Sequence, residues 1–441
     1  MHDVALCLHR ADVKPPNTLA EWLAHIGQQH SAEIVMGLDR VAAVWQRMGA
    51  PGASLNITVG GTNGKGSTGA MLESMLHAAG YKTGFYSSPH LIRYNERVRI
   101  GKSEIDDTSL IESFATVEAA RVLDGAPLPL TYFEFATLSA LWIFAREKLD
   151  IAILEVGLGG RLDAVNIVDA DVSIVVSVDL DHQSYLGDTR EKIGFEKAHI
   201  YRTGHAAIFG DTDPPQSLVS YANRIGADLR ILNRDFRFQK QDLQWKFHGQ
   251  NSVRHALPYP ALRGNYQLKN ASAALAALEA LRDRLPVSQG AVKRGLLEVE
   301  WPGRMQVLPG RPAVVLDVAH NPHAARALAE ALGSMGFFQN TYAVFGMLKD
   351  KDIDAVIELV KHRIDYWFIA GLETVAGTRG ANVDLLAEKL TAHSLQDKFS
   401  RHASVTSAYA AAREHAGQND RILVFGSFST VGEILGIVRS H

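Results

Sequence analysis

The sequence has one cysteine, Cys7, which excludes an intrachain disulfide framework and a metal cluster held by cysteines alone. It has no run of about 18 apolar residues, so no membrane-spanning helix is expected. The start carries an acid and lacks a basic segment followed by an apolar stretch, so no signal peptide is expected. Lys and Arg number 45 against 48 Asp and Glu, a net charge of −3. This balance argues against a strongly basic nucleic-acid binder and against a membrane-surface protein. We therefore expect a soluble, cytoplasmic protein with neither kind of partner.

The chain of 441 residues is long enough for two or three domains, and its 46% hydrophobic and 21% charged residues are typical of a globular protein. Short β-branched runs alternate with amphipathic helical segments, which predicts an α/β protein with mostly parallel sheets. In the first part we expect strands at 55–59, 151–156 and 172–178 and helices at 67–79 and 131–146. In the second part we expect strands at 313–318, 342–345, 366–370 and 422–425 and helices at 324–332 and 352–361.

The two parts meet near the Pro- and Gly-containing strings 301–304 and 309–312, the best candidates for a linker. This predicts a nucleotide-binding domain over residues 1–302 and a smaller, Rossmann-like α/β domain over residues 303–441. Within the first of these domains, residues 236–247 alternate enough to suggest antiparallel hairpins.

A glycine-rich loop, Gly60 to Ser67, lies between a predicted strand and a predicted helix. That is the setting of a phosphate loop, in which backbone N–H groups, the helix N-terminus and Lys65 hold phosphate oxygens. The loop is a variant, because position 59 is Val and Gly66 follows the lysine where Ser or Thr is usual. The alternative is a plain glycine turn before a helix.

Glu155 ends an apolar strand of the same domain, where a carboxylate is placed to hold magnesium. The alternative is a solvated acid at the end of a strand. Asp181 and His182 also follow a strand, with Lys197 downstream, but alone a structural histidine and a solvated lysine are the commoner interpretations.

In the second domain, the string from Asp317 to His323 closes a strand, and Gly426 to Thr430 follows the last strand. Polar residues beyond the carboxyl ends of parallel strands are where open α/β sheets bind ligands. Each string is also compatible with a simple helix cap.

Together these strings resemble the folylpolyglutamate synthase/dihydrofolate synthase family, a branch of the Mur-ligase-like ATP-dependent amide ligases. The similarity runs in family order from near residue 31 to near residue 435. The matching blocks are 61–67, 86–91, 130–134, 154–164, 196–198, 302–304, 317–323 and 426–428.

The resemblance implies an ATP site in a Mur-ligase central-type domain. Its nucleotide residues are Thr62, Asn63, Gly64, Lys65, Gly66, Ser67, Asn270, Arg304 and Asp317. It further implies two Mg²⁺ ions, the first held by Ser88 and Glu155 and the second by His182, with Lys197 as a candidate for carbamylation. A carbamate converts a cation into an anionic oxygen ligand that suits magnesium. Lys65, Glu155, His182 and Lys197 are thus the expected catalytic residues.

The resemblance also implies where the substrates bind. A pterin site is expected at Thr131, Tyr132, Phe133, Glu134, Leu162, Asp163 and Ala164. The incoming glutamate is expected at His320 and Ser427, with Ser429 nearby. One departure is that Asn265-Tyr266-Gln267 stands ahead of Asn270, where many Mur-like ligases have Gly-x-His-Asn.

The implied activity is addition of L-glutamate to dihydropteroate, then of further glutamates to reduced folates, with ATP consumed through an acyl phosphate and ADP and phosphate released. The blocks at 131–134 and 162–164, with residues 30–41, favour the bifunctional type. The alternatives are folylpolyglutamate synthase alone or a Mur-type ligase for another substrate. A phosphate-loop NTPase switch is a further alternative that the phosphate loop alone leaves open, whereas a non-catalytic nucleotide-binding module is disfavoured by the full set of charged residues. Family analogy favours a monomer.

Overall fold

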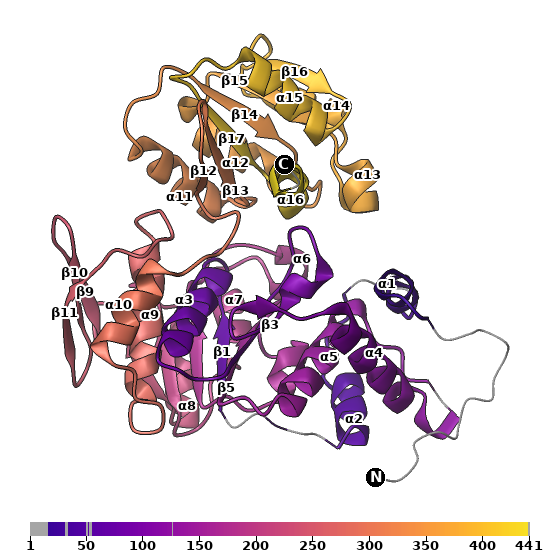
Figure 1. The fold of residues 1–441 in the computed structure, drawn as a ribbon, viewed down its shortest axis with the longest axis vertical. Helices are drawn as coiled ribbons and strands as arrows, with labels where there is room; N and C mark the ends of the chain where they lie inside the picture. Colours follow the sequence, from indigo (N-terminus) through magenta and orange to yellow (C-terminus); the bar gives the residue numbers. More distant parts are fainter. Residues whose placement is uncertain (1–15, 31–33, 50–51, 53–54, 126, 440–441) are drawn as a thin grey trace.

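The structure, a computed structural model, describes residues 16–30, 34–49, 52, 55–125 and 127–439. The expectations that concern Cys7, the first four residues and part of the segment 30–41 lie outside the described residues. None of the helices within these ranges is long and apolar enough to cross a membrane. The chain forms two lobes, with the N-terminal lobe below and the C-terminal lobe above in Figure 1.

The N-terminal lobe is built on an eight-stranded sheet with the order β4-β3-β2-β5-β1-β6-β7-β8. The six strands from β2 to β8 in that order are parallel, β3 pairs antiparallel with β2, and β4 pairs antiparallel with β3. These strands are β1 (Asn56–Gly60), β2 (Thr83–Tyr86), β3 (Val98–Ile100), β4 (Ser103–Glu104), β5 (Ile151–Glu155), β6 (Val172–Val175), β7 (Ala206–Phe209) and β8 (Asp228–Ile231).

Helices cover both faces of this sheet. Those on the described part of the lobe are α1 (Leu19–Gly27), α2 (Asp39–Arg47), α3 (Lys65–Ala78), α4 (Asp107–Arg121), α5 (Tyr132–Arg146), α6 (Gln183–Leu186), α7 (Arg190–Ala198), α8 (Gln216–Ile225), α9 (Gln267–Ala280) and α10 (Gln289–Leu297). Helix α3 is buried on all sides from Gly66 to Leu76, because it lies between the sheet and helices α9 and α10. A helix enclosed in this way needs small residues where neighbours approach closely.

A separate three-stranded antiparallel sheet of β9 (Arg237–Lys240), β10 (Trp245–His248) and β11 (Val253–Leu257) projects from the side of this lobe (Figure 1). The hairpins expected at 236–247 are therefore present, with a third strand added. The alternation of apolar and polar residues explains these hairpins, since Trp245 and Phe247 are buried while the intervening Lys246 is partly exposed.

The C-terminal lobe is built on a six-stranded sheet with the order β12-β13-β17-β14-β15-β16, parallel except for β12. Its strands are β12 (Gln306–Leu308), β13 (Ala313–Asp317), β14 (Thr341–Phe345), β15 (Tyr366–Ala370), β16 (Phe399–His402) and β17 (Arg421–Phe425). Its helices are α11 (Pro322–Gly333), α12 (Ile353–Val360), α13 (Glu373–Ala376), α14 (Val383–Ala392), α15 (Val405–His415) and α16 (Phe428–Arg439). The expected fold class, a parallel-rich phosphate-loop domain followed by a smaller α/β domain, is confirmed.

Element boundaries differ from the expected ones where polar residues end or begin an element. The helix expected at 67–79 begins two residues earlier, at Lys65, since Gly64 takes a left-handed conformation (φ +88°) that starts it. The helix expected at 131–146 begins after Thr131, whose hydroxyl caps it. The strand expected at 172–178 ends at Val175, where the chain turns toward the phosphate loop.

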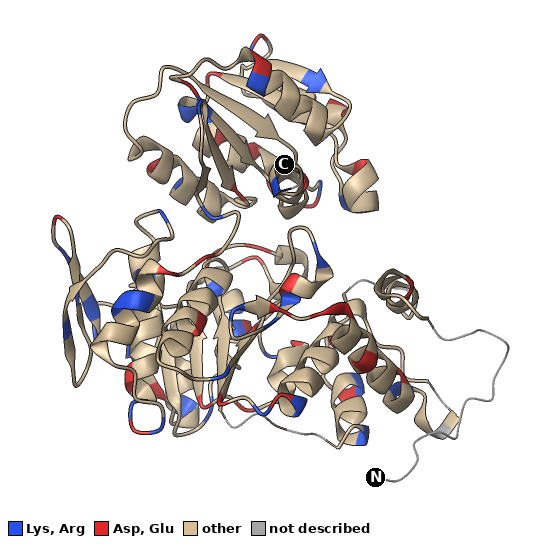
Figure 2. Ribbon diagram, viewed as in Figure 1, with Lys and Arg blue, Asp and Glu red and all other residues tan. Residues whose placement is uncertain are grey.

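Lys and Arg are interspersed with Asp and Glu over both lobes in this view (Figure 2). The mixture agrees with the net charge of −3.

Candidate active site

The order of the strands brings several of the predicted residues to one edge of the N-terminal sheet. Strand β1 lies between β5 and β6, so the phosphate loop, Glu155 and the residues after β6 all leave the sheet at neighbouring carboxyl ends. Strand β2 is parallel to β5 on its other side, which brings Ser88 to the same edge. Parallel sheets place their ligand sites at such an edge.

The phosphate loop is held by the chain that follows β6. Thr62 N–H donates to the Ser177 carbonyl at 2.8 Å, and Asn63 N–H donates to the Ser177 hydroxyl at 3.1 Å. Lys65 Nζ folds back onto the Gly61 carbonyl at 3.1 Å. Position 64 needs a glycine for two reasons: its φ is positive, and an added Cβ would lie 2.7 Å from Asn270 Oδ1. Asn270 is thereby placed directly against the loop.

Glu155 is 5% exposed and lies beside Ser88, whose N–H donates to Oε2 at 3.3 Å. Burial raises the pKa of the Glu155 carboxyl, and the nearby cations Lys65 and Arg304 oppose that shift. Within the described ranges no Lys or Arg forms an ion pair with Glu155 within 4.0 Å. A buried carboxylate without a Lys or Arg partner is suited to binding a metal cation that enters the site together with a ligand.

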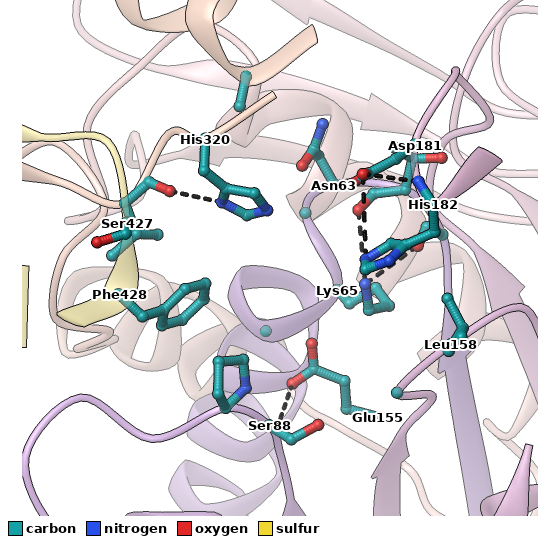
Figure 3. Close-up of a pocket in the computed structure, with 18 of the residues that line it drawn as sticks. Asn63, Lys65, Ser88, Glu155, Leu158, Asp181, His182, His320, Ser427 and Phe428 are labelled. Atoms are coloured by element: carbon teal, nitrogen blue, oxygen red, sulfur yellow. Dashed lines mark hydrogen bonds and ion pairs between the residues drawn. The ribbon is translucent and has the colours of Figure 1, made fainter. Parts of the chain in front are cut away.

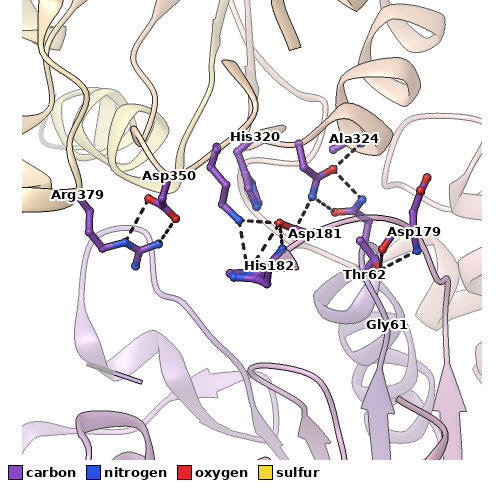
Figure 4. Close-up of polar contacts among 12 residues, drawn as sticks. Gly61, Thr62, Asp179, Asp181, His182, His320, Ala324, Asp350 and Arg379 are labelled. Atoms are coloured by element: carbon purple, nitrogen blue, oxygen red, sulfur yellow. Dashed lines mark hydrogen bonds and ion pairs between the residues drawn. The ribbon is translucent and has the colours of Figure 1, made fainter. Parts of the chain in front are cut away.

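Lys197 and His182 line the same cavity from the other side of the loop. Burial lowers the pKa of the Lys197 ammonium to about 7 and that of His182 to about 4. His182 adopts a left-handed backbone conformation (φ 50°) at the start of α6. Lys351 Nζ, from the other lobe, lies 3.4 Å from His182 Nε2 and 2.8 Å from Asp181 Oδ1 (Figure 4).

The segment expected to contact the pterin begins helix α5 with a capping box. Thr131 Oγ1 accepts from the Glu134 N–H, and Glu134 Oε2 accepts from the Thr131 N–H at 2.8 Å. The other oxygen of Glu134 pairs with Arg40 Nη2 at 2.7 Å, so its carboxylate is fully engaged by the protein. Asp163 caps the short helix Ala164–Ile167, accepts from Leu158 N–H, and has a pKa raised to about 7 by burial.

The C-terminal lobe faces this edge with the carboxyl ends of its own strands. Asp317 ends β13 and accepts from the N–H groups of Met305 and Ala319, both at 2.8 Å. His320 Nδ1 donates to the Val318 carbonyl at 2.8 Å, which leaves Nε2 as an acceptor, and burial lowers the pKa of His320 to about 4. Ser427 caps α16, with its hydroxyl accepting from the Thr430 N–H at 3.0 Å. The interpretation of Ser427 as a helix cap therefore holds alongside any ligand role.

These residues surround one cavity of about 1050 Å³ between the two lobes. Every site residue expected from the sequence lines it, from both lobes. Figure 3 shows Lys65, Glu155 and His182 facing His320, Ser427 and Phe428 across the open centre. The arrangement places a phosphate loop, a buried carboxylate and a neutral imidazole around one space.

Two functional candidates were not identified from the sequence. Arg97 lines the cavity with 9% exposure, lies over the rings of Tyr94 and Tyr132 at 5.3 and 5.5 Å, and donates to His90 Nδ1 at 2.9 Å. Among the described residues no Asp or Glu lies within ion-pair distance of it. Its position just after the block 86–91 could have drawn attention to it.

Lys351 is the second such residue. Its side chain is only 7% exposed, yet in the sequence it stands in the run Lys349-Asp350-Lys351-Asp352, which looks like a solvated surface. Asn321 Nδ2 donates to the free oxygen of Asp181 at 2.9 Å, and the side-chain amides of Asn321 and Asn63 bond each other at 3.1 and 3.2 Å. Asp181 is thus bonded twice by the C-terminal lobe (Figure 4).

The donor set can be compared with what a divalent cation needs. No group of three or more His, Cys, Asp or Glu among the described residues could enclose a metal ion. Ser88 and Glu155 supply hard oxygen donors beside the phosphate loop. Mg²⁺ is commonly bound by one or two carboxylates together with phosphate oxygens and water. The residues therefore fit a magnesium ion that is completed by a bound nucleotide.

Comparisons with known proteins agree with this geometry. The Mur ligase middle domain matches residues 59–278, and the Mur ligase glutamate ligase domain matches residues 303–428. The dihydrofolate synthase/folylpolyglutamate synthase of Escherichia coli (strain K12) is 43% identical over 424 residues, covering 96% of each chain. The structure of E. coli FolC in complex with DHPP and ADP superposes with a TM-score of 0.90 at 42% identity, covering 96% of this chain and 98% of that one. A bifunctional folylpolyglutamate synthase/dihydrofolate synthase with Mn, AMPPNP and L-glutamate bound gives a TM-score of 0.87, also at 42% identity, with the same coverage.

Proposed function

The chain belongs to the dihydrofolate synthase/folylpolyglutamate synthase family of Mur-type ligases, and on that premise we propose that it joins L-glutamate to dihydropteroate and then to reduced folates at the expense of ATP. The observation that carries the proposal is the single cavity in which the phosphate loop and Glu155 of one lobe face His320 of the other. An amide does not form from a carboxylate and an amine in neutral water without activation. Transfer of the γ-phosphoryl group of ATP to the carboxylate supplies a leaving group.

The nucleotide is proposed to bind at the phosphate loop, Thr62 to Ser67, with Lys65 on its phosphates. Among the described residues, the hydrogen-bond partners of Lys65 Nζ are the main-chain carbonyls of Gly61 and Thr62, so it can turn to a phosphate without breaking an ion pair there. Asn270, Arg304 and Asp317 line the same part of the cavity and are assigned to the rest of the nucleotide. Catalysis there consists mainly of positioning and charge neutralisation.

Magnesium is proposed at Ser88 and Glu155, where, when bound, it would neutralise charge on the transferred phosphoryl group. A second ion is proposed at His182. Its lowered pKa keeps the imidazole neutral at pH 7, the form that binds metals. Since Lys351 Nζ lies against His182 Nε2, that ammonium has to move aside when the second ion binds.

Carbamylation of Lys197 is proposed from its burial. With a pKa near 7, a large fraction of this side chain is the neutral amine at neutral pH. The amine nitrogen attacks the carbon of CO2, an N–C bond forms, and one proton passes to water. The product is an anion near the ammonium of Lys65, and that positive charge favours the negative carbamate.

The domain division expected from the sequence is retained as part of the proposal. Residues 1–302 hold ATP and the pteroate, and residues 303–441 bring glutamate to His320 and Ser427. The pterin is proposed to lie at Thr131 to Glu134 and Leu162 to Ala164, which line the same cavity. Neutral His320 presents Nε2 as an acceptor for the glutamate amine. Enclosure between the lobes shields the acyl phosphate from hydrolysis. By analogy with the family, we propose a monomer that acts in the cytoplasm.

The test is an ADP-release assay with dihydropteroate, tetrahydrofolate and glutamate each omitted in turn, with the product identified by mass spectrometry. The proposal expects ADP release to need glutamate and a pterin acceptor together, and a mass increase of one glutamyl unit. Activity with tetrahydrofolate but not dihydropteroate would indicate folylpolyglutamate synthase alone. Activity with neither would leave a Mur-type ligase for another substrate.

A further inference from the structure

The phosphate loop carries a glycine, Gly66, at the position where Ser or Thr is usual, and the structure supplies a steric reason. A Cβ built at Gly66 would lie 2.6 Å from Nε1 of Trp301 and 3.0 Å from its Cε2. A Cβ contact of 2.6 Å is essentially never observed, so the indole would have to shift to make room for a side chain at position 66. Gly66 is buried in the first turn of α3, directly after Lys65.

Trp301 is held against this turn by groups that belong to the same part of the fold. Its ring lies 5.2 Å from that of Phe85 and 5.6 Å from the guanidinium of Arg99. Arg99 in turn pairs at 3.0 Å with Glu73, which is 1% exposed and lies on α3 itself. The partly buried indole therefore contacts a strand, a cation and the helix whose N-terminus it touches.

Trp301 is also the first residue of the linker between the lobes. Two residues later, the Gly303 carbonyl accepts from the Val318 N–H at 2.9 Å, and Arg304 lines the cavity. An added Cβ at Gly303 would lie 3.0 Å from Val318 and 3.2 Å from Val431, both in the C-terminal lobe. The chain thus passes from the phosphate loop to the other lobe within three residues.

We propose that Trp301 is a positioning residue for the phosphate loop, with its indole fixing the first turn of α3 and joining that turn to the linker between the lobes. The inference rests on the proposed nucleotide site. Backbone N–H groups at a helix N-terminus bind phosphate only if they point at it, so a first turn that is free to shift binds less tightly. Trp301 touches no reacting atom and acts through Gly66.

The test is a double-mutant cycle on the full chain with the variants Trp301→Leu, Gly66→Ala and the two combined, repeated with Trp301→Phe. The affinity for ADP with Mg²⁺ is measured by isothermal titration, and the unfolding temperature is recorded for each variant. Gly290→Ala is the matched glycine control, because Gly290 is likewise the second residue of a helix and an added Cβ meets only Ser288 Oγ, at 3.9 Å. Trp142→Leu is the matched tryptophan control, since Trp142 also packs under an arginine, Arg146, but on α5.

Trp301→Leu and Gly66→Ala should each weaken ADP binding about tenfold, equivalent to about 1.4 kcal/mol. Trp301→Phe should remain within about threefold of the unaltered protein, because a ring still covers Gly66. In the combined variant, Gly66→Ala should have little further effect, since the smaller side chain leaves room for the new methyl group. The KM for ATP should rise with the Kd while the unfolding temperature follows that of the controls.

The inference is overturned if Trp301→Leu binds ADP as tightly as the unaltered protein does. It is also overturned if the loss of ADP affinity in the combined variant equals the product of the losses in Gly66→Ala and Trp301→Leu. Those results leave the nucleotide site standing. Failure of the unaltered protein to bind ADP overturns the proposed function and this inference with it. If Trp301→Leu does not fold, Gly66→Ala in the otherwise unaltered chain decides, because an ADP affinity equal to that of the Gly290→Ala control overturns the inference.

Discussion

Arg40 offers a test of the pteroate end of the site, because it joins two segments that line the cavity. From α2 its Nη2 donates to the Val35 carbonyl at 3.1 Å and to Glu134 Oε1 at 2.7 Å. Val35 lies in a stretch that lines the cavity, and Glu134 holds the N–H of Thr131. Arg40→Met removes both bonds, keeps much of the apolar stem, and leaves the carboxylate of Glu134 without its cation.

The size of the effect follows from the two hydrogen bonds that the substitution removes. A hydrogen bond to a charged group contributes about 1.5–3 kcal/mol. The Arg40 side chain is 22% exposed and that of Glu134 only 5%, so solvent reaches the ion pair from the arginine side and weakens it in part. We take about 1.5–3 kcal/mol for the pair of bonds together, which is a roughly 10- to 150-fold loss if all of it falls on dihydropteroate affinity.

The assay is steady-state ADP release with the KM of dihydropteroate, ATP and glutamate measured separately. Arg40→Met should raise the KM of dihydropteroate by at least about tenfold and change that of ATP little. The matched control is Arg47→Met, on the same helix, where Nη1 donates to the carbonyls of Ala120 and Arg121, away from the cavity. An equal rise in all three KM values, or the same behaviour in the control, would refute the reasoning.

Three further predictions use other parts of the site. Lys65→Ala should abolish ligation while the unfolding temperature stays unchanged, because within the described part of the chain its ammonium bonds to main-chain carbonyls alone; near-normal turnover would refute its phosphate role. Lys197→Met should raise the free energy of unfolding more at pH 7 than at pH 10. Burial lowers the pKa of Lys197 to about 7 in the folded protein, so between that pH and about 10.4 the unfolded chain binds one more proton than the folded chain. The stability of the unaltered protein therefore rises with pH over this range, by up to about 1.4 kcal/mol per pH unit, until the cost of burying Lys197 is gone. Denaturant melts at the two pH values would show the opposite trend if the lysine were paired. His320→Ala should weaken glutamate use more than ATP binding, checked by titrating each ligand; an equal loss of both would place His320 elsewhere in the site.

Much of the N-terminal half of the site could be predicted from the sequence, because its residues follow strands that are easy to recognise. The strand that precedes the phosphate loop and the strand that ends in Glu155 are continuous apolar runs, typical of buried parallel strands. Once both are placed in one parallel sheet, their carboxyl ends must meet at one edge. Periodicity could not supply the boundaries, such as the start of α3 at Lys65, because these depend on a single backbone conformation at Gly64.

The residues that could not be identified from the sequence are those whose partners are distant along the chain. Arg97, Lys351 and Trp301 each look ordinary in their local setting, as a charge after a turn, a member of a charge run and a linker aromatic. Their burial comes from contacts between segments that no local pattern encodes. The missing side chain at Gly66 was visible in the sequence as a departure from the usual phosphate loop, but its reason lies 235 positions further along the chain, at Trp301.

The two half-sites have a common physical origin, which explains why neither is complete alone. Each lobe is a parallel sheet whose polar side chains collect at the carboxyl ends of neighbouring strands, β5, β1 and β6 in one lobe and β13, β17 and β14 in the other. When the two edges face each other, Asp181 of the first is bonded by Asn321 and Lys351 of the second. In the proposed reaction an acyl phosphate must meet an amine before it meets water, and two opposed edges favour this because both reactants lie in one cavity lined by both lobes. The linker after Trp301, whose indole lies against Gly66, joins the proposed nucleotide site to the lobe that is proposed to bring glutamate.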